Sequence, residues 1–186
     1  MARRINLTVI MVGFLLAACG SSASVPSAAA SAPVVPSAVP IASPTADVVV
    51  VGDRPVTVHV PPGYDPSHPA PLLIALHHYG GSGAEQETYF KLGALANQRG
   101  YLYALPDGTF NDSGIRFWNA TDACCDFDRS GVDDVSYLAR VIKEIQASFA
   151  VDPQRIDLIG HSNGGFMVYG MACAHEIGRA SCRERV

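Results

Sequence analysis

Residues 155–166 read Arg-Ile-Asp-Leu-Ile-Gly-His-Ser-Asn-Gly-Gly-Phe. A strand is predicted over the first five of these residues, and a helix is predicted from Phe166 to Ala174. Between them, Gly160, Ser162 and Gly164 have the Gly-x-Ser-x-Gly spacing of a nucleophile elbow, in the strand-to-helix setting that the motif requires. Glycine is needed on both sides of the serine because a Cβ atom there would collide with neighbouring elements as the chain reverses. The stretch predicts a sharp turn that presents the Ser162 hydroxyl above a sheet and points helix amides at a developing negative charge.

The chain before this turn alternates predicted strands with predicted helices. β-branched and apolar runs bounded by Gly and Pro predict strands, and apolar residues at helical spacing predict helices. The order indicates an α/β fold: a parallel sheet with an antiparallel start and helices on both faces. The predicted elements are a hairpin of strands 48–51 and 55–60, a buried strand over 71–77, a helix over 84–98 capped by Gly100, a strand over 101–105, an irregular stretch to Gly131, and a helix with one apolar face through Val135, Leu138, Ile142, Ile145 and Phe149.

Composition limits the classes of partner. The chain has 186 residues, of which 48% are hydrophobic and 16% charged, so most of it can bury a core. Without the first 18 and last ten residues, 8 basic residues face 16 acidic ones. A negative surface argues against nucleic acid as a partner. The five cysteines show no Cys-x-x-Cys spacing, so no zinc site is predicted.

The first 46 residues predict export. Arg3 and Arg4 precede a short apolar run at 7–16, which is too short to span a bilayer and is typical of a signal peptide over residues 1–18. The Leu-Ala-Ala-Cys sequence that ends at Cys19 resembles a bacterial lipobox, which implies lipidation of Cys19; an ordinary signal peptide is the alternative. The Ser/Ala/Pro-rich residues 19–46 predict a disordered tether. We therefore expect an extracytoplasmic protein, either attached to the membrane by its N-terminal lipid or secreted.

The last ten residues have a different character. Residues 177–186 break from the preceding apolar helix, and their sequence is similar to the in-frame translation of a short-read sequencing adapter. We expect this tail to be non-native. Residues 47–176 are then the N-terminal portion of a domain whose continuation is missing.

Several blocks of sequence, taken in order, resemble one family. Over about residues 55–175 the chain is similar to esterases of the polyhydroxybutyrate depolymerase and feruloyl esterase group, within the α/β-hydrolases. The resemblance implies ester hydrolysis through an acyl-serine at Ser162, with a Ser-His-Asp triad and without metal or organic cofactor. The blocks are Leu76-His77 with Gly80-Gly81, Pro106-Asp107-Gly108-Thr109, Phe117-Trp118-Asn119-Ala120-Thr121-Asp122-Ala123-Cys124-Cys125, Val132-Asp133-Asp134-Val135 and Gly160-His161-Ser162-Asn163-Gly164-Gly165.

An oxyanion hole is expected from two backbone segments. In this fold, one amide follows the nucleophile and the other comes from the loop after the first buried strand. The sequence assigns these donors to the N–H groups of Asn163 and Tyr79. His78 stands where the familiar loop has glycine. His77 has two interpretations, a brace for this loop or a catalytic base, of which we favour the brace.

The general base is not found in this sequence. The triad order in this fold is Ser, then Asp or Glu, then His. After Ser162, the expected native part holds no Asp, and its histidine, His175, lies 13 residues further along the same helix. That spacing is roughly 20 Å along the axis, too far for a base. His161 is expected to point elsewhere. The triad partners are therefore expected downstream, and this chain by itself is expected to be inactive. A non-catalytic surface lipoprotein that binds polymer or sugar is the alternative, and a peptidase of the same fold is a third interpretation.

Three smaller features stay open. Trp118 either walls an acyl pocket or packs in the core. One of Cys124 and Cys125 can form a disulfide with Cys173, because an exported protein meets oxidising conditions. Asp126 and Asp128 have two interpretations, a calcium site or a solvated loop. We favour the loop, because the spacing lacks the remaining calcium ligands.

Overall fold

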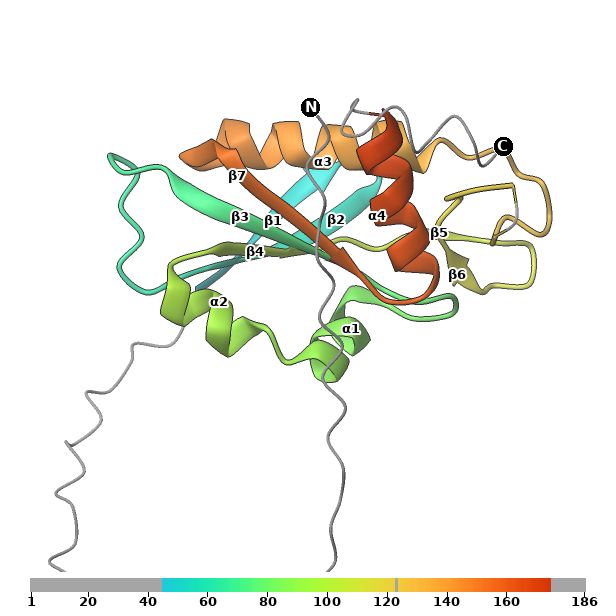
Figure 1. Cartoon of the computed structure of the whole chain (residues 1–186), viewed down its shortest axis with the longest axis horizontal. Coiled ribbons are helices and arrows are strands. Elements are labelled where there is room, and N and C mark those ends of the chain that lie inside the picture. The colour runs from blue at the N-terminus through green and yellow to red at the C-terminus, as the bar shows by residue number, and fades with distance from the viewer. Residues whose placement is uncertain (1–44, 123, 175–186) are drawn as a thin grey trace, which may run out of the picture. The chain divides into compact units, whose positions relative to one another are not determined.

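The computed structural model describes residues 45–122 and 124–174 (Figure 1). The predicted signal peptide, Cys19, most of the predicted tether, His175 and the tail at 177–186 lie outside these residues. Of the described helices, none is long and apolar enough to cross a bilayer.

A five-stranded sheet forms the centre of the domain. Its strand order is β1-β2-β4-β3-β7. β1 and β2 pair antiparallel, as do β2 and β4, whereas β3 runs parallel to both β4 and β7. The predicted α/β sheet with an antiparallel start is therefore confirmed. The strand bounds are β1 Thr45–Val51, β2 Arg54–Val60, β3 Ala70–Leu76, β4 Leu102–Leu105 and β7 Val151–Gly160.

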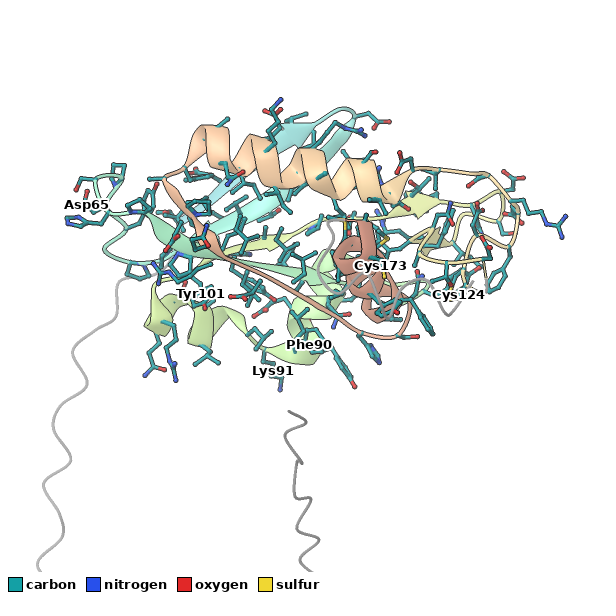
Figure 2. The ribbon with its side chains drawn as sticks, turned by 45° about the horizontal axis from the view of Figure 1, so that its top comes forward. Asp65, Phe90, Lys91, Tyr101, Cys124 and Cys173 are labelled. Carbon is teal, nitrogen blue, oxygen red and sulfur yellow. A yellow bond between two sulfur atoms is a disulfide. The ribbon has the colours of Figure 1, made fainter. Side chains whose placement is uncertain are left out.

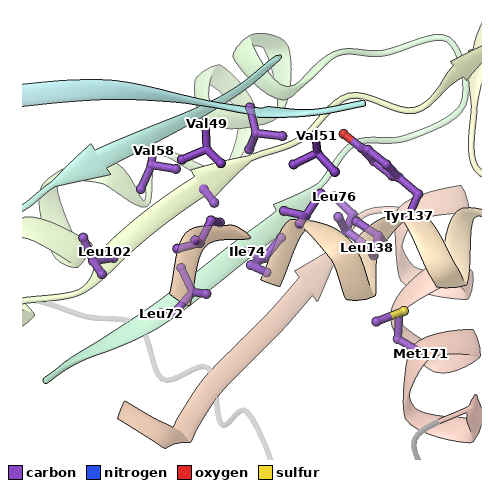
Figure 3. Close-up of a cluster of buried hydrophobic side chains, with 14 of the residues drawn as sticks. Val49, Val51, Val58, Leu72, Ile74, Leu76, Leu102, Tyr137, Leu138 and Met171 are labelled. Carbon is purple, nitrogen blue, oxygen red and sulfur yellow. The ribbon is translucent and has the colours of Figure 1, made fainter. Parts of the chain in front are cut away.

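Helices cover both faces of this sheet, as predicted. Helices α1 (Gly83–Phe90) and α2 (Gly93–Arg99) lie on one face, and α3 (Asp134–Ser148) and α4 (Asn163–Ala174) lie on the other (Figure 1). The larger core fills the space under α3 and α4 (Figure 3) and includes Leu72, Ile74, Leu76, Leu138 and Met171. A smaller cluster of Ala75, Ala96, Tyr103 and Leu105 packs under α1 and α2. Neighbouring residues of β3 thus enter different cores, which explains why its sequence is apolar throughout.

The single helix predicted over 84–98 is wrong, because the chain breaks it into α1 and α2. Lys91 takes a left-handed conformation with φ 55°, and its N–H donates to the Glu87 carbonyl, which ends α1. The Glu87 carboxylate then accepts the Gly93 N–H at 3.1 Å and caps the start of α2. Side-chain capping of a helix start satisfies an otherwise unpaired donor. Because an acidic side chain caps from six residues upstream, spacing alone does not reveal the break.

Three boundaries and one loop also differ from the sequence prediction. β1 begins at Thr45, three residues before its predicted start and inside the predicted tether. α4 begins at Asn163, three residues before its predicted start, and β7 begins at Val151, four residues before its predicted start. The stretch expected to be irregular contains a small antiparallel pair, β5 (Thr109–Phe110) and β6 (Arg116–Phe117). The hairpin β1–β2 and the cap at Gly100, with φ 70°, are as predicted.

One edge of the sheet is open. Within the described residues, β7 pairs only with β3, so its other edge carries unpaired backbone groups. An apolar hollow of about 530 Å³ lies beside it, between α3, β7 and α4.

Candidate active site

The turn between β7 and α4 has the geometry of the predicted elbow. The β3–β7 ladder ends where Leu76 pairs with Gly160, and α4 begins three residues later at Asn163. Ser162 lies between them with φ 51° and is exposed. A left-handed conformation costs a residue with a Cβ atom about 1–2 kcal/mol. The strained serine therefore stands at the carboxyl edge of the parallel strands, accessible from solvent.

Both glycines of the motif are needed for close backbone approach. A Cβ atom at Gly160 would collide with the backbone of Gly164, where α4 begins. A Cβ atom at Gly164 would collide with the carbonyl oxygens of Leu76 and His77, at the end of β3. The steric argument made from the sequence is therefore confirmed, with the partners of each glycine now identified.

The two predicted oxyanion donors have no acceptor within the described part of the chain. Neither the Asn163 N–H nor the Tyr79 N–H donates a hydrogen bond to another described residue, although Asn163 is fully buried. The N–H groups that follow them are engaged: Gly164 donates to the His161 carbonyl at 2.9 Å, and Gly80 donates to that of Arg116 at 2.7 Å. At the end of β3, the Leu76 carbonyl accepts a hydrogen bond of 3.2 Å from the His161 N–H. Both amides are thus available for a ligand oxygen, and their role in an oxyanion hole stays a prediction.

The side chain of Asn163 is held by Trp118. Its Oδ1 accepts the Trp118 backbone N–H at 2.8 Å, and its Nδ2 donates to the Trp118 carbonyl at 2.9 Å. The indole Nε1 of Trp118 donates to the His77 carbonyl at 3.1 Å. Trp118 is fully buried and packs against Tyr137, which supports core packing over a pocket wall. Nothing in the sequence indicated this pairing, because Asn163 occupies the variable position of the motif.

His77 braces the loop that carries Tyr79. Its Nδ1 lies 2.7 Å from the His78 carbonyl, and its Nε2 accepts the Gly108 N–H at 2.9 Å. Because Nε2 accepts, the proton of the neutral ring lies on Nδ1. Burial lowers the pKa of His77. Since both ring nitrogens are engaged by the backbone, the structure favours the bracing interpretation over the catalytic base.

The His161 ring packs against α1. It stacks on Tyr89 of α1 at 4.5 Å with an interplanar angle of 7°, and lies 5.4 Å from the ring of His78. The side chain therefore joins the elbow to α1.

Charged side chains, to which the sequence assigned no role, hold the surrounding loops. Asp107 Oδ1 accepts the Gly83 N–H at 2.8 Å, and Oδ2 lies 3.1 Å from the Arg116 guanidinium. Arg54 forms an ion pair of 3.2 Å with Asp134, whose side chain is fully buried. Burial raises the pKa of Asp134, and the hydrogen bond from the Asn119 N–H opposes that rise. The Pro-Asp-Gly turn around Asp107 was the available signal for the first of these contacts.

Three of the five cysteines, Cys124, Cys125 and Cys173, lie among the described residues. Figure 2 shows Cys124 on the loop after β6 and Cys173 near the end of α4. The structure joins Cys124 to its neighbour Cys125 by a disulfide, and Cys173 is also disulfide-bonded. Cys124 lies beside the elbow, because its Sγ is 3.9 Å from Asn163 Nδ2. A bond from one of the adjacent pair to Cys173 stays a prediction.

Asp126 and Asp128 support their own loop. Asp126 accepts the N–H groups of Ser130 and Gly131, at 2.9 and 2.8 Å, and Asp128 accepts that of Asp112 at 3.1 Å. Over residues 45–122 and 124–174, no group of three or more His, Cys, Asp or Glu is placed to hold a metal ion. In this structure both carboxylates therefore accept hydrogen bonds from backbone N–H groups.

Comparison with known proteins identifies esterases among the relatives. No family model matches the chain. It is 32% identical over 176 residues to NocK of Nocardia uniformis subsp. tsuyamanensis, which is provisionally named an esterase; the match covers 86% of this chain and 49% of NocK. It is 35% identical over 120 residues to feruloyl esterase B of Piromyces equi, covering 64% of this chain and 21% of that enzyme. The chain therefore spans half or less of the length of these relatives.

Solved structures share the fold. An acetyl xylan esterase from Aspergillus awamori superposes with a TM-score of 0.57 at 17% identity, over 72% of this chain and 47% of that one. A thermostable esterase superposes with a TM-score of 0.54 at 15% identity, over 74% of this chain and 39% of that one. The predicted fold class, the α/β fold of the α/β-hydrolases, is confirmed.

Proposed function

We propose that this chain is the nucleophile-bearing N-terminal part of a serine esterase of the polyhydroxybutyrate depolymerase and feruloyl esterase group, in which Ser162 forms an acyl-enzyme. One observation carries the proposal: an exposed serine held at φ 51° in the tight turn between β7 and α4. Strain at a non-glycine residue persists where the surrounding structure enforces it, and such residues cluster at active sites. The esterase names of the relatives support the same assignment.

The proposed reaction gives each of these groups a role. A base takes the proton of Ser162 Oγ, the oxygen attacks the ester carbonyl carbon, and the negative charge moves to the carbonyl oxygen. The N–H groups of Asn163 and Tyr79 donate to that oxygen. The alcohol leaves with the proton, and water then attacks the acyl-serine in the same way. No metal or organic cofactor takes part in this proposal.

The base and its acidic partner belong, in this proposal, to a part of the protein outside this sequence. His77 is engaged by the backbone at both nitrogens, and His161 stacks on Tyr89. The triad order of the fold places the acid and the histidine after the nucleophile. The roughly twofold greater length of NocK leaves room for such residues.

We infer the substrate class and location from the relatives and the N-terminal sequence. The proposed substrates are feruloyl or acetyl esters of polysaccharides, or hydroxyalkanoate polyesters. The proposed location is extracytoplasmic, with a lipid on Cys19 as the membrane anchor or, without it, secretion. A Cys19→Ala variant that leaves the membrane fraction while wild type stays there would support the anchor.

The test uses the complete gene, sequenced past codon 176. Wild type, Ser162→Ala and Ser148→Ala are assayed with p-nitrophenyl acetate, methyl ferulate and a hydroxybutyrate oligomer. Each is also labelled with a fluorophosphonate, which reacts with activated serines. Ser148 is a matched control because it is exposed at the far end of α3. We expect Ser162→Ala to lose hydrolysis and labelling, and Ser148→Ala to keep both. Hydrolysis that survives in Ser162→Ala, or its absence from wild type on all three esters, would refute the proposal.

A further inference from the structure

The residue after the candidate nucleophile makes contacts that its place in the motif does not require. The oxyanion role of Asn163 needs only its backbone N–H. Its side chain is nevertheless fully buried and forms two hydrogen bonds with one other residue, Trp118. A side-chain amide can donate and accept at the same time, as a backbone peptide does. Asn163 therefore pairs with the Trp118 backbone in both directions.

The same residue also holds the second proposed donor. The Trp118 indole donates to the His77 carbonyl, two residues before Tyr79. The His77 ring is fixed in turn by the Gly108 N–H, and it packs at a tilt of 33° against Trp118, with ring centroids 4.9 Å apart. Trp118 is thus bonded to both backbone segments that would form the oxyanion hole.

We propose that the Asn163 side chain and Trp118 are positioning residues, which hold the N–H groups of Asn163 and Tyr79 in one fixed arrangement around the oxyanion. This inference rests on the proposed esterase function. Asn163 Oδ1 and Nδ2 fix the side chain, and through Cα they fix the peptide whose N–H would meet the substrate oxygen. The hydrogen bond from the Trp118 indole to the His77 carbonyl sets the distance from that peptide to the loop of Tyr79.

The expected effect is on the transition state more than on substrate binding. Oxyanion donors act at about 2.7–3.1 Å from the oxyanion, and the loss of one donor costs about 10²–10³ in kcat. A misplacement of about 1 Å costs up to about 10². Removal of the Asn163 side-chain amide leaves the backbone N–H groups of Asn163 and Tyr79 present but less constrained. We therefore expect a fall of about 10–100-fold in kcat, with KM changed by less than about threefold.

The experiment compares three variants of the full-length protein with wild type. Asn163→Ala removes both bonds to Trp118. Trp118→Phe keeps an aromatic side chain and the backbone but removes the indole N–H that donates to the His77 carbonyl. Asn119→Ala is the matched control, because its amide also donates to a backbone carbonyl, that of Val132 at 2.8 Å, one residue away from Trp118. Each variant is measured for kcat and KM on p-nitrophenyl acetate, for inhibition by a trifluoromethyl ketone, and for thermal unfolding.

The inhibitor separates positioning from a purely structural role. A trifluoromethyl ketone adds to the serine and places an oxyanion in the hole, so its inhibition constant should rise by the same factor as kcat/KM falls. We expect this parallel change in Asn163→Ala, a smaller one of up to about tenfold in Trp118→Phe, and less than a twofold change in Asn119→Ala. A lower kcat with an unchanged inhibition constant would overturn the inference.

The outcomes distinguish this inference from the function on which it rests. If wild type shows no hydrolysis that depends on Ser162, the esterase proposal fails. If wild type is active and Asn163→Ala is folded with wild-type kcat, only the positioning role fails. If Asn163→Ala does not fold, Trp118→Phe decides, and an unchanged kcat and inhibition constant there would overturn the inference.

Discussion

Replacing Gly164 by alanine should destabilise the domain by forcing β3 and α4 apart. The new Cβ atom would meet the carbonyl oxygens of Leu76 and His77, and these are backbone atoms held by the end of the β3–β7 ladder. They cannot rotate away as a flexible side chain would. Gly165 provides a matched control, because a Cβ atom there lies 3.3 Å from the Gly160 carbonyl and needs only a small adjustment.

The magnitude follows from two opposing contributions. Overpacking a tightly packed site costs about 1–3 kcal/mol, and the backbone collision at Gly164 places it near the upper end. Alanine in place of glycine within a helix gains about 1 kcal/mol in both variants. We expect Gly164→Ala to lose about 2 kcal/mol and Gly165→Ala to change little. For a chain of this size, that difference is about 4–8 °C in Tm.

The assay can follow the one tryptophan of the sequence. Trp118 is fully buried, so unfolding exposes its indole and changes its fluorescence. Thermal and urea transitions of wild type, Gly164→Ala and Gly165→Ala give the free energies of unfolding. Equal transition midpoints for the two variants would refute the reasoning, because they would show that the end of β3 yields to the extra methyl group.

Three further perturbations test other contacts. Ser162→Gly should be more stable than Ser162→Ala by up to about 1 kcal/mol, because glycine accepts φ 51° without strain; equal Tm values would contradict this. Burial lowers the pKa of His77 below its usual 6.5, so the unfolded chain binds more protons and stability should fall as the pH drops below about 6.5; His77→Gln should weaken this dependence in urea titrations at pH 5 and 7.5. Arg54→Met should cost about 3 kcal/mol at pH 7 by leaving buried Asp134 unpaired. Because burial raises the pKa of Asp134, that loss should shrink towards pH 4, where the carboxyl can be neutral, and an equal loss at both pH values would argue against it.

Local patterns were enough to predict the sheet and the elbow. Ser162 stands between two glycines, with a strand before and a helix after, and each of these signals is contained within about 20 residues. The steric need for Gly160 and Gly164 follows from the reversal of the chain alone, and the structure adds only the partners. Contiguous apolar runs such as β3 are equally direct, because burial on both faces leaves no room for polar residues.

Contacts between distant segments were not predictable in the same way. Asn163 and Trp118 are 45 residues apart, and neither residue type at its position implies the other. The break at Lys91 depends on Glu87 reaching Gly93, although the apolar spacing suits one continuous helix. Nothing in the sequence links Arg54 to Asp134, and their ion pair needs the folded sheet to bring them together. A pattern within one segment predicts local structure, whereas these contacts depend on how several segments pack together.

The open edge of β7 bears on how this chain behaves at high concentration. Long uncovered edges invite pairing with other molecules, and proline and charged side chains suppress it. On β7 the proline and two of the three charges fall in the first half, at Asp152, Pro153 and Arg155, which leaves 158–160 without such protection. Intermolecular strand addition would therefore start next to Ser162. Concentrated samples of this chain should therefore oligomerise through β7, and dilution should restore the monomer.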